Sequence, residues 1–152
     1  MEIIEQLERT QAETLKYFDL ADADLEKNYG PGKWSIRYLL HHLADSETVF
    51  LYRIRRVISE PKQVIWVYDQ DAWAQKLDYS RVPLELAKTL YLSSREGVKY
   101  YARLHYERSN DITFVHSETG LRTLKNEFDK VASHNQQHLN DIEKALLSSP
   151  ND

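Results

Sequence analysis

Residues 35–59 read SIRYLLHHLADSETVFLYRIRRVIS, and this stretch decides the fold class. Its apolar side chains recur every three or four positions, with polar and charged residues between them, which is the period of one buried helix face. That face contains Ile36, Leu40, Leu43, Phe50, Ile54 and Val57. Ser35 suits the N-cap position, and Pro61 ends the helix because proline cannot continue it. The stretch therefore predicts one long amphipathic helix.

Three further segments share the helical period: residues 2–25, residues from Pro83 to about 104, and residues 124–148. The turn residues of Asn28–Lys33 separate the first helix from the second. Two longer connections without helical period, Gln63–Asp78 and Ser109–Gly120, join the remaining helices. This order predicts an all-α fold, a four-helix bundle with two longer connections, either antiparallel throughout or with crossovers. A chain of 152 residues suits a single such domain over residues 1–152.

The amino-acid composition limits the kinds of binding site and partner that we expect for this chain. With 41% hydrophobic and 29% charged residues and only four Gly and four Pro, it is typical of a helical globular protein. The chain has no cysteine, so any metal site must use His, Asp or Glu. A net charge of −4 gives no general attraction to phosphate backbones, and we expect no nucleic-acid partner. No apolar run approaches the roughly 20 residues that cross a bilayer, so we expect a cytoplasmic protein without membrane contact.

The histidines supply the candidate site. His134 and His138 stand four residues apart, so they lie on adjacent turns of one helix face and can reach one ion. At about 100° per residue, both flank the apolar stripe of the last helix, and His42 lies near the inner boundary of the second helix. The same helical wheel points His41 towards solvent. Three imidazoles from two facing helices predict an open divalent-metal site, and the alternative is a set of partly buried histidines at the edge of the core.

Carboxylates and a further histidine surround this candidate site in the sequence. Asp45 lies one turn from His42, and Asp141 one turn from His138, so each is a candidate to accept a hydrogen bond from an imidazole. The alternative is that both carboxylates are solvated. His116 and Glu118 lie in the connection before the last helix, where a loop would cover the open end of the bundle. We expect that loop and the connection after residue 61 to cover the site.

Four motifs resemble the DinB/YfiT-like superfamily, in family order over nearly the whole chain. They are Lys33–Glu47 (KWSIRYLLHHLADSE), Val67–Trp73 (VYDQDAW), His116–Gly120 (HSETG) and His134–His138 (HNQQH). Proteins of the YfiT branch of that family are often called metal-dependent hydrolases or bacillithiol transferases. The resemblance implies metal ligands at His42, His134 and His138, a zinc or nickel ion, and frequent homodimers, for which the apolar outer positions from Val64 to Trp73 offer a surface. This chain has Glu47 where thiol transferases of the branch commonly have His.

The resemblance implies a metal-dependent enzyme that acts on small molecules. The first candidate reaction is thiol S-transfer, in which an external low-molecular-weight thiol is activated by the ion and attacks an electrophile. The second is hydrolysis by activated water, with Glu47 or Glu118 as general base. A third hypothesis, from another class, is a non-catalytic bundle with a structural metal or a vestigial site.

Overall fold

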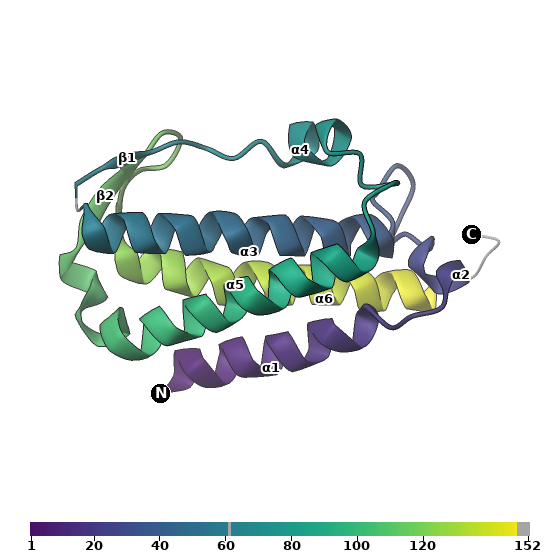
Figure 1. Ribbon diagram of the computed structural model, residues 1–152, viewed down its shortest axis with the longest axis horizontal. Coiled ribbons are helices and arrows are strands. Elements are labelled where there is room, and N and C mark those ends of the chain that lie inside the picture. The colour runs from purple at the N-terminus through teal and green to yellow at the C-terminus, as the bar shows by residue number, and fades with distance from the viewer. Residues whose placement is uncertain (61, 149–152) are drawn as a thin grey trace.

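The computed structural model describes residues 1–60 and 62–148 (Figure 1), so Pro61 and the last four residues of the predicted domain lie outside the described part. The helices are α1 (Glu2–Tyr17), α2 (Asp22–Leu25), α3 (Ile36–Ser59), α4 (Gln70–Lys76), α5 (Leu84–His105), the 3-10 helix η1 (Tyr106–Asp111) and α6 (Leu124–Leu147). The strands are β1 (Val64–Ile65), β2 (Thr113–His116) and β3 (Gly120–Thr123). Among these helices, none is long and apolar enough to cross a bilayer.

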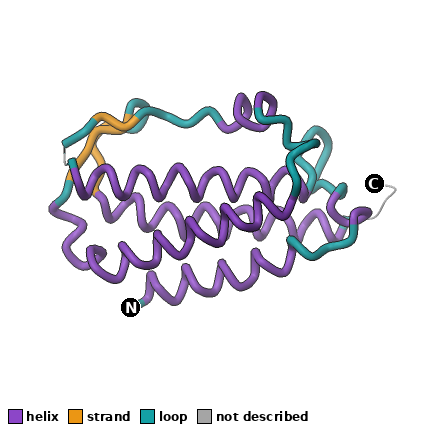
Figure 2. The backbone as a smooth tube through the Cα atoms, in the orientation of Figure 1, coloured by secondary structure: helices purple, strands orange, loops and turns teal. Residues whose placement is uncertain are grey.

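The four long helices α1, α3, α5 and α6 form a bundle, as the sequence predicts (Figure 1). They do not alternate in direction throughout. Glu47 of α3 contacts Arg95 of α5, and Leu51 lies close to Gly97, so these two neighbours run parallel. The antiparallel arrangement is therefore wrong for this pair, and the crossover alternative holds. Residues 62–83 return along the outside of α3 before α5 begins, which is what allows two consecutive long helices to point the same way (Figure 2).

The two connections contain more regular structure than the sequence predicts. The segment before α5 contains β1 and the short helix α4, whose N-cap Asp69 accepts a hydrogen bond from the backbone N–H of Ala72 at 3.0 Å. The segment before α6 forms a hairpin of β2 and β3, and β1 pairs in parallel with β2. The pairing of β1 escapes sequence analysis because its partner β2 lies far away in the chain. This small sheet ties the two connections together at one end of α3.

The first predicted helix, residues 2–25, is broken in the structure. Helix α1 ends at Tyr17, and α2 begins at Asp22. Acidic side chains are unfavourable at a helix C-terminus and favourable at an N-terminus, so Asp22 and Asp24 suit a new start better than a continuation. The bend also lets Phe18 and Leu25 enter the same apolar cluster.

A polar layer divides the core of the bundle into two apolar clusters. One cluster gathers Ile3, Leu7, Phe50, Ile54, Val98 and Phe128, and the other Phe18, Ile36, Leu40, Leu43, Tyr91 and Ile142. Between them each long helix contributes buried polar side chains, among them Thr14, His42, Glu47, Arg95 and Asn135. Polar groups buried at mid-height of a bundle need partners, and they mark the level of the candidate site.

Candidate metal centre

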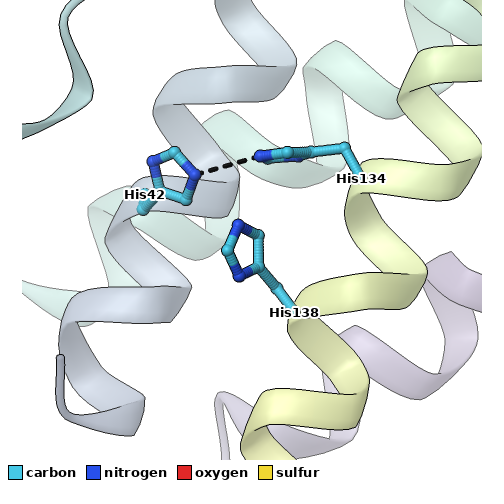
Figure 3. Close-up of side chains that lie close together, drawn as sticks. All are labelled: His42, His134 and His138. Atoms are coloured by element: carbon cyan, nitrogen blue, oxygen red, sulfur yellow. Dashed lines mark hydrogen bonds between the residues drawn. The ribbon is translucent and has the colours of Figure 1, made fainter. Parts of the chain in front are cut away.

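Three histidines meet where α3 faces α6. Each of His42, His134 and His138 offers one ring nitrogen, and these three atoms lie within 4.8 Å of one another (Figure 3). The Nε2 atoms of His42 and His134 are 3.0 Å apart. Two nitrogens bound to one ion at about 2.1 Å lie about 3.0 to 3.4 Å apart, so this pair already has the spacing of two ligands. The donor set fits a divalent first-row metal ion.

Local structure explains how the rings converge. His134 and His138 lie one turn apart on α6, and their ring centroids are 4.6 Å apart. His42 comes from α3, and two aromatic rings pack near its imidazole, that of Trp34 at 5.2 Å and the parallel ring of Tyr68 at 6.3 Å. In this arrangement the imidazole of His42 faces His134 and His138 on α6.

Burial keeps two of the three imidazoles neutral near pH 7. Loss of hydration, with the charge on His138 as a smaller cause, lowers the pKa of His42 to about 3. Burial, followed by the charges on His138 and His42, lowers the pKa of His134 to about 2. The pKa of His138 is also lowered by burial, and Asp141 opposes that shift. Neutral imidazoles keep a lone pair on one ring nitrogen, which is the form that binds a metal ion.

The carboxylates near the cluster differ in what they contact. Asp141 lies 3.1 Å from Nδ1 of His138, so an N–H at Nδ1 leaves Nε2 free to face the other rings. Asp45 accepts a hydrogen bond from the Tyr79 hydroxyl at 2.5 Å instead of contacting His42. The hydroxyl of Ser46, one turn further along α3, lies 3.4 Å from both ring nitrogens of His42.

Glu47 lies in the polar layer, and its carboxylate is held by Arg95. The Arg95 guanidinium donates to both Glu47 oxygens and also to the backbone carbonyl of Leu7. Arg95 is fully buried, and Glu47 is 1% exposed. The structure thus places Glu47 in a paired structural position.

A cavity of about 240 Å³ opens beside the cluster, and His42 and His134 form part of its wall. The hairpin of β2 and β3 contributes His116, which ends β2, and Glu118, which lies in the turn, to the same wall. His116 is buried, and its Nδ1 accepts a hydrogen bond from the backbone N–H of Glu118 at 3.2 Å. Burial, with Arg53 as the next cause, lowers the pKa of His116. Of the two glutamates predicted as general bases, Glu118 is therefore the one that lines the cavity.

His41 contradicts the helical-wheel prediction. It is 2% exposed and stacks on Tyr79 at 5.2 Å. The prediction failed because the connection that contains α4 covers this face of α3, which a wheel of one isolated helix cannot include. Burial lowers the pKa of His41 to about 4.

Sequence analysis missed three residues of this region. Ser46 lies one turn after His42, and Lys130 lies one turn before His134 on the cavity wall. Both could have been found from the same four-residue spacing that joins the histidines. Tyr68 lies within the motif Val67–Trp73, but its contact with His42 depends on the crossover of residues 62–83.

Comparison with known proteins places this geometry in a family. The DinB superfamily profile matches residues 6–142. A protein of Oceanobacillus iheyensis, named a putative metal-dependent hydrolase, is 31% identical over 90% of this chain and 77% of its own length. A second protein of that organism, with the same kind of name, is 29% identical over 86% of this chain and 75% of its own length. The solved structure of YfiT from Bacillus subtilis superposes with a TM-score of 0.81 and 23% identity, over 95% of this chain and 83% of that one. Its title describes a probable metal-dependent hydrolase with an unusual four-helix bundle topology, and this likeness shows the fold.

Proposed function

We propose that this chain, which belongs to the DinB superfamily, is a metal-dependent enzyme that acts on small molecules. The observation that carries the proposal is the convergence of His42, His134 and His138 within 4.8 Å, beside a cavity whose wall includes His42 and His134. Three protein ligands beside a cavity leave coordination positions for a substrate, which is typical of catalytic rather than structural sites.

The chain's own residues prepare this site for chemistry. Asp141 contacts the ring of His138, and the rings of Trp34 and Tyr68 pack near that of His42. A divalent ion held there supplies Lewis acidity, which makes a thiol or a water molecule acidic enough to act as a nucleophile near neutral pH. Glu118 lines the cavity and is exposed, which supports it as the base that accepts the proton lost by the nucleophile.

The first candidate reaction is thiol S-transfer, which the motif resemblance favours. An external low-molecular-weight thiol forms a bond from its sulfur to an electrophilic carbon, its proton passes to a base or to water, and any leaving group departs with the electrons of its bond. The thiol must be external because the chain has no cysteine.

The second candidate is hydrolysis of a small ester or amide. Two observations favour it: the names of the two Oceanobacillus proteins, and the position of Glu118 on the cavity wall. A panel of thiol-conjugation and hydrolysis assays separates the two reactions. Turnover that depends on added thiol and is lost in His42→Ala supports S-transfer, whereas thiol-independent turnover lost in the same variant supports hydrolysis.

Metal content is the direct test of the proposed site. We expect untagged protein to contain, or to take up, about one equivalent of zinc, nickel or a similar ion when measured by plasma mass spectrometry. His42→Ala and His138→Ala should each lose it. His105→Ala is the matched control, because His105 ends α5 and is not part of the cluster. Wild-type protein that binds neither added zinc nor added nickel would overturn the proposal.

A purely structural metal has a different signature. Removing it with a chelator would lower the melting temperature strongly, and no substrate in the panel would turn over. For a catalytic ion, chelation abolishes turnover and returning the metal restores it.

A further inference from the structure

The cavity beside His42 and His134 has cationic side chains that the metal site does not use. Arg53 lines it and is only 4% exposed. Its guanidinium donates to the backbone carbonyl of Trp66 at 2.9 Å and lies 3.9 Å from the carboxylate of Glu127. The Nε atom of Arg122 lies 3.7 Å from the other oxygen of Glu127. Two arginines thus share one buried carboxylate. Lys130 and Glu118 also line the cavity, so three cations (Arg53, Arg122 and Lys130) face two carboxylates (Glu127 and Glu118) in this region.

Lys130 adds a third cation to this wall. It lines the cavity and is half-buried, and within the described residues its ammonium group forms no ion pair. The ammonium lies 5.8 Å from the centre of the Phe50 ring. Loss of hydration lowers the pKa of Lys130, and the charge on Glu127 opposes that shift. A partly dehydrated cation without a partner gains most from an anion that enters the cavity.

The distances connect this cation with the histidines. Lys130 and His134 lie one turn apart on α6, about 6 Å along the helix axis at a rise of about 1.5 Å per residue. Phe50 is near both of them, because its ring centre is 5.5 Å from that of His134 and 5.8 Å from the Lys130 ammonium. A molecule only a few bonds long that rests on Phe50 therefore reaches from the ammonium group to the histidine cluster.

We propose that the cavity binds a small organic anion whose carboxylate or phosphate group is held by Lys130, with Arg53 beside it. The apolar part of this molecule lies on Phe50, and its other end points to His134. Lys130 is then the residue that selects anionic substrates. What happens at the histidine end rests on the proposed metal-dependent function, but the contact between the anion and Lys130 needs no metal.

The test uses metal-free protein and named probes. We expect butyrate, titrated into isotope-labelled protein, to shift the amide NMR signals of residues around Phe50, Lys130 and His134 in a saturable way. Butyramide, which has the same shape without the charge, should bind at least about tenfold more weakly, because a charge-assisted hydrogen bond is lost. Inorganic phosphate is titrated in parallel. Saturation by butyrate points to a carboxylate substrate, and saturation by phosphate alone points to a phosphorylated one.

Variants show whether Lys130 holds the anion. Lys130→Gln should weaken binding of the saturating probe about tenfold or more, and Lys130→Arg should largely preserve it. Lys144→Gln, on the exposed end of the same helix, is the matched control and should bind like wild type. Equal binding by wild type and Lys130→Gln, or no saturable shift with either anion, would overturn the proposal.

The two proposals fail separately. If the protein binds metal but neither anion, the proposed metal site stands and the proposed anion site is refuted. If the protein binds butyrate through Lys130 but takes up neither zinc nor nickel, the proposed anion site stands and the proposed metal-dependent function is refuted.

Discussion

Asp141 has a specific role among the carboxylates of this chain, because it alone of the two predicted imidazole partners contacts a histidine of the cluster. Its contact with Nδ1 of His138 is 3.1 Å, whereas Asp45 is bound to Tyr79. The spacing in the sequence suggests equally that Asp45 contacts His42 and that Asp141 contacts His138. The two carboxylates differ because their side chains leave their helices in different directions.

This difference predicts unequal effects on metal affinity. Asp141→Asn should weaken zinc binding about 10- to 100-fold, because the carboxylate no longer orients the imidazole or raises its basicity. Competition with a chromophoric chelator measures the affinity. Asp45→Asn is the control and should change the affinity far less. Equal losses in the two variants would contradict the role assigned to Asp141.

The buried histidines also predict how stability depends on pH. In the unfolded chain His42 and His134 take up protons near pH 6.5, but in the folded protein their pKa values are lowered to about 3 and 2. Between these values the unfolded state binds more protons, so the free energy of unfolding is highest above about pH 6.5 and falls as the pH decreases. The slope is at most about 1.4 kcal/mol per pH unit for each imidazole.

Urea unfolding of metal-free protein between about pH 7.5 and pH 5 measures this slope. His134→Gln should make it shallower, whereas His105→Gln should leave it unchanged. A slope that is the same in wild type and His134→Gln would show that His134 titrates normally in the folded protein.

At the scale of elements, helices α3 and α5 approach each other closely at Gly97, and this contact is not evident from the sequence. Gly97 looks like a weak point of an amphipathic helix. In the structure a Cβ atom at this position would lie 2.9 Å from both terminal methyl groups of Leu51. The absence of a side chain is therefore what lets the parallel helices pack closely.

A larger side chain at this position should separate the two helices. Gly97→Leu should lower the free energy of unfolding by about 1 to 3 kcal/mol, because Leu51 cannot move far from a packed interface. Ser93→Leu, on the exposed face of the same helix, controls for residue size and should be nearly neutral. In the double variant with Leu51→Ala the loss should be smaller than the sum of the single losses, and strict additivity would argue against direct contact.

At the scale of the whole molecule, the polar layer joins all four long helices. From α5, Arg95 contacts the Leu7 carbonyl on α1, Glu47 on α3 and Asn135 on α6. Asn135 in turn accepts a hydrogen bond from the Tyr91 hydroxyl at 2.7 Å. The buried charges are therefore paired and hydrogen-bonded, as burial requires.

Breaking this pairing should be costly. Arg95→Met leaves the Glu47 carboxylate buried without a partner and should destabilise the protein by about 3 to 5 kcal/mol. The double variant with Glu47→Leu should recover much of that loss, because neither charge of this pair is then left buried without its partner. Chemical unfolding of wild type, the two single variants and the double variant measures the four free energies of this double-mutant cycle. A double variant as unstable as Arg95→Met would mean that the arginine acts through its other contacts.

The homodimer expected from the family stays a prediction at this scale. Trp66 and Val64, on the connection that carries β1, are 76% and 50% exposed. If this surface is the interface, light scattering should give the mass of two chains, and Trp66→Ser should give the mass of one. A monomeric wild type at micromolar concentration would remove the prediction.

The sequence by itself determined the four long helices and the three histidines that converge, because helical periodicity and the four-residue spacing of His134 and His138 are local properties of the chain. The tertiary structure decided the parallel packing of α3 and α5, the burial of His41 and the distinct partners of Glu47 and Glu118. These features depend on residues 62–83 crossing over α3 and pairing with β2. Contacts between residues so distant in sequence leave no periodic signal, since they arise only when the bundle packs.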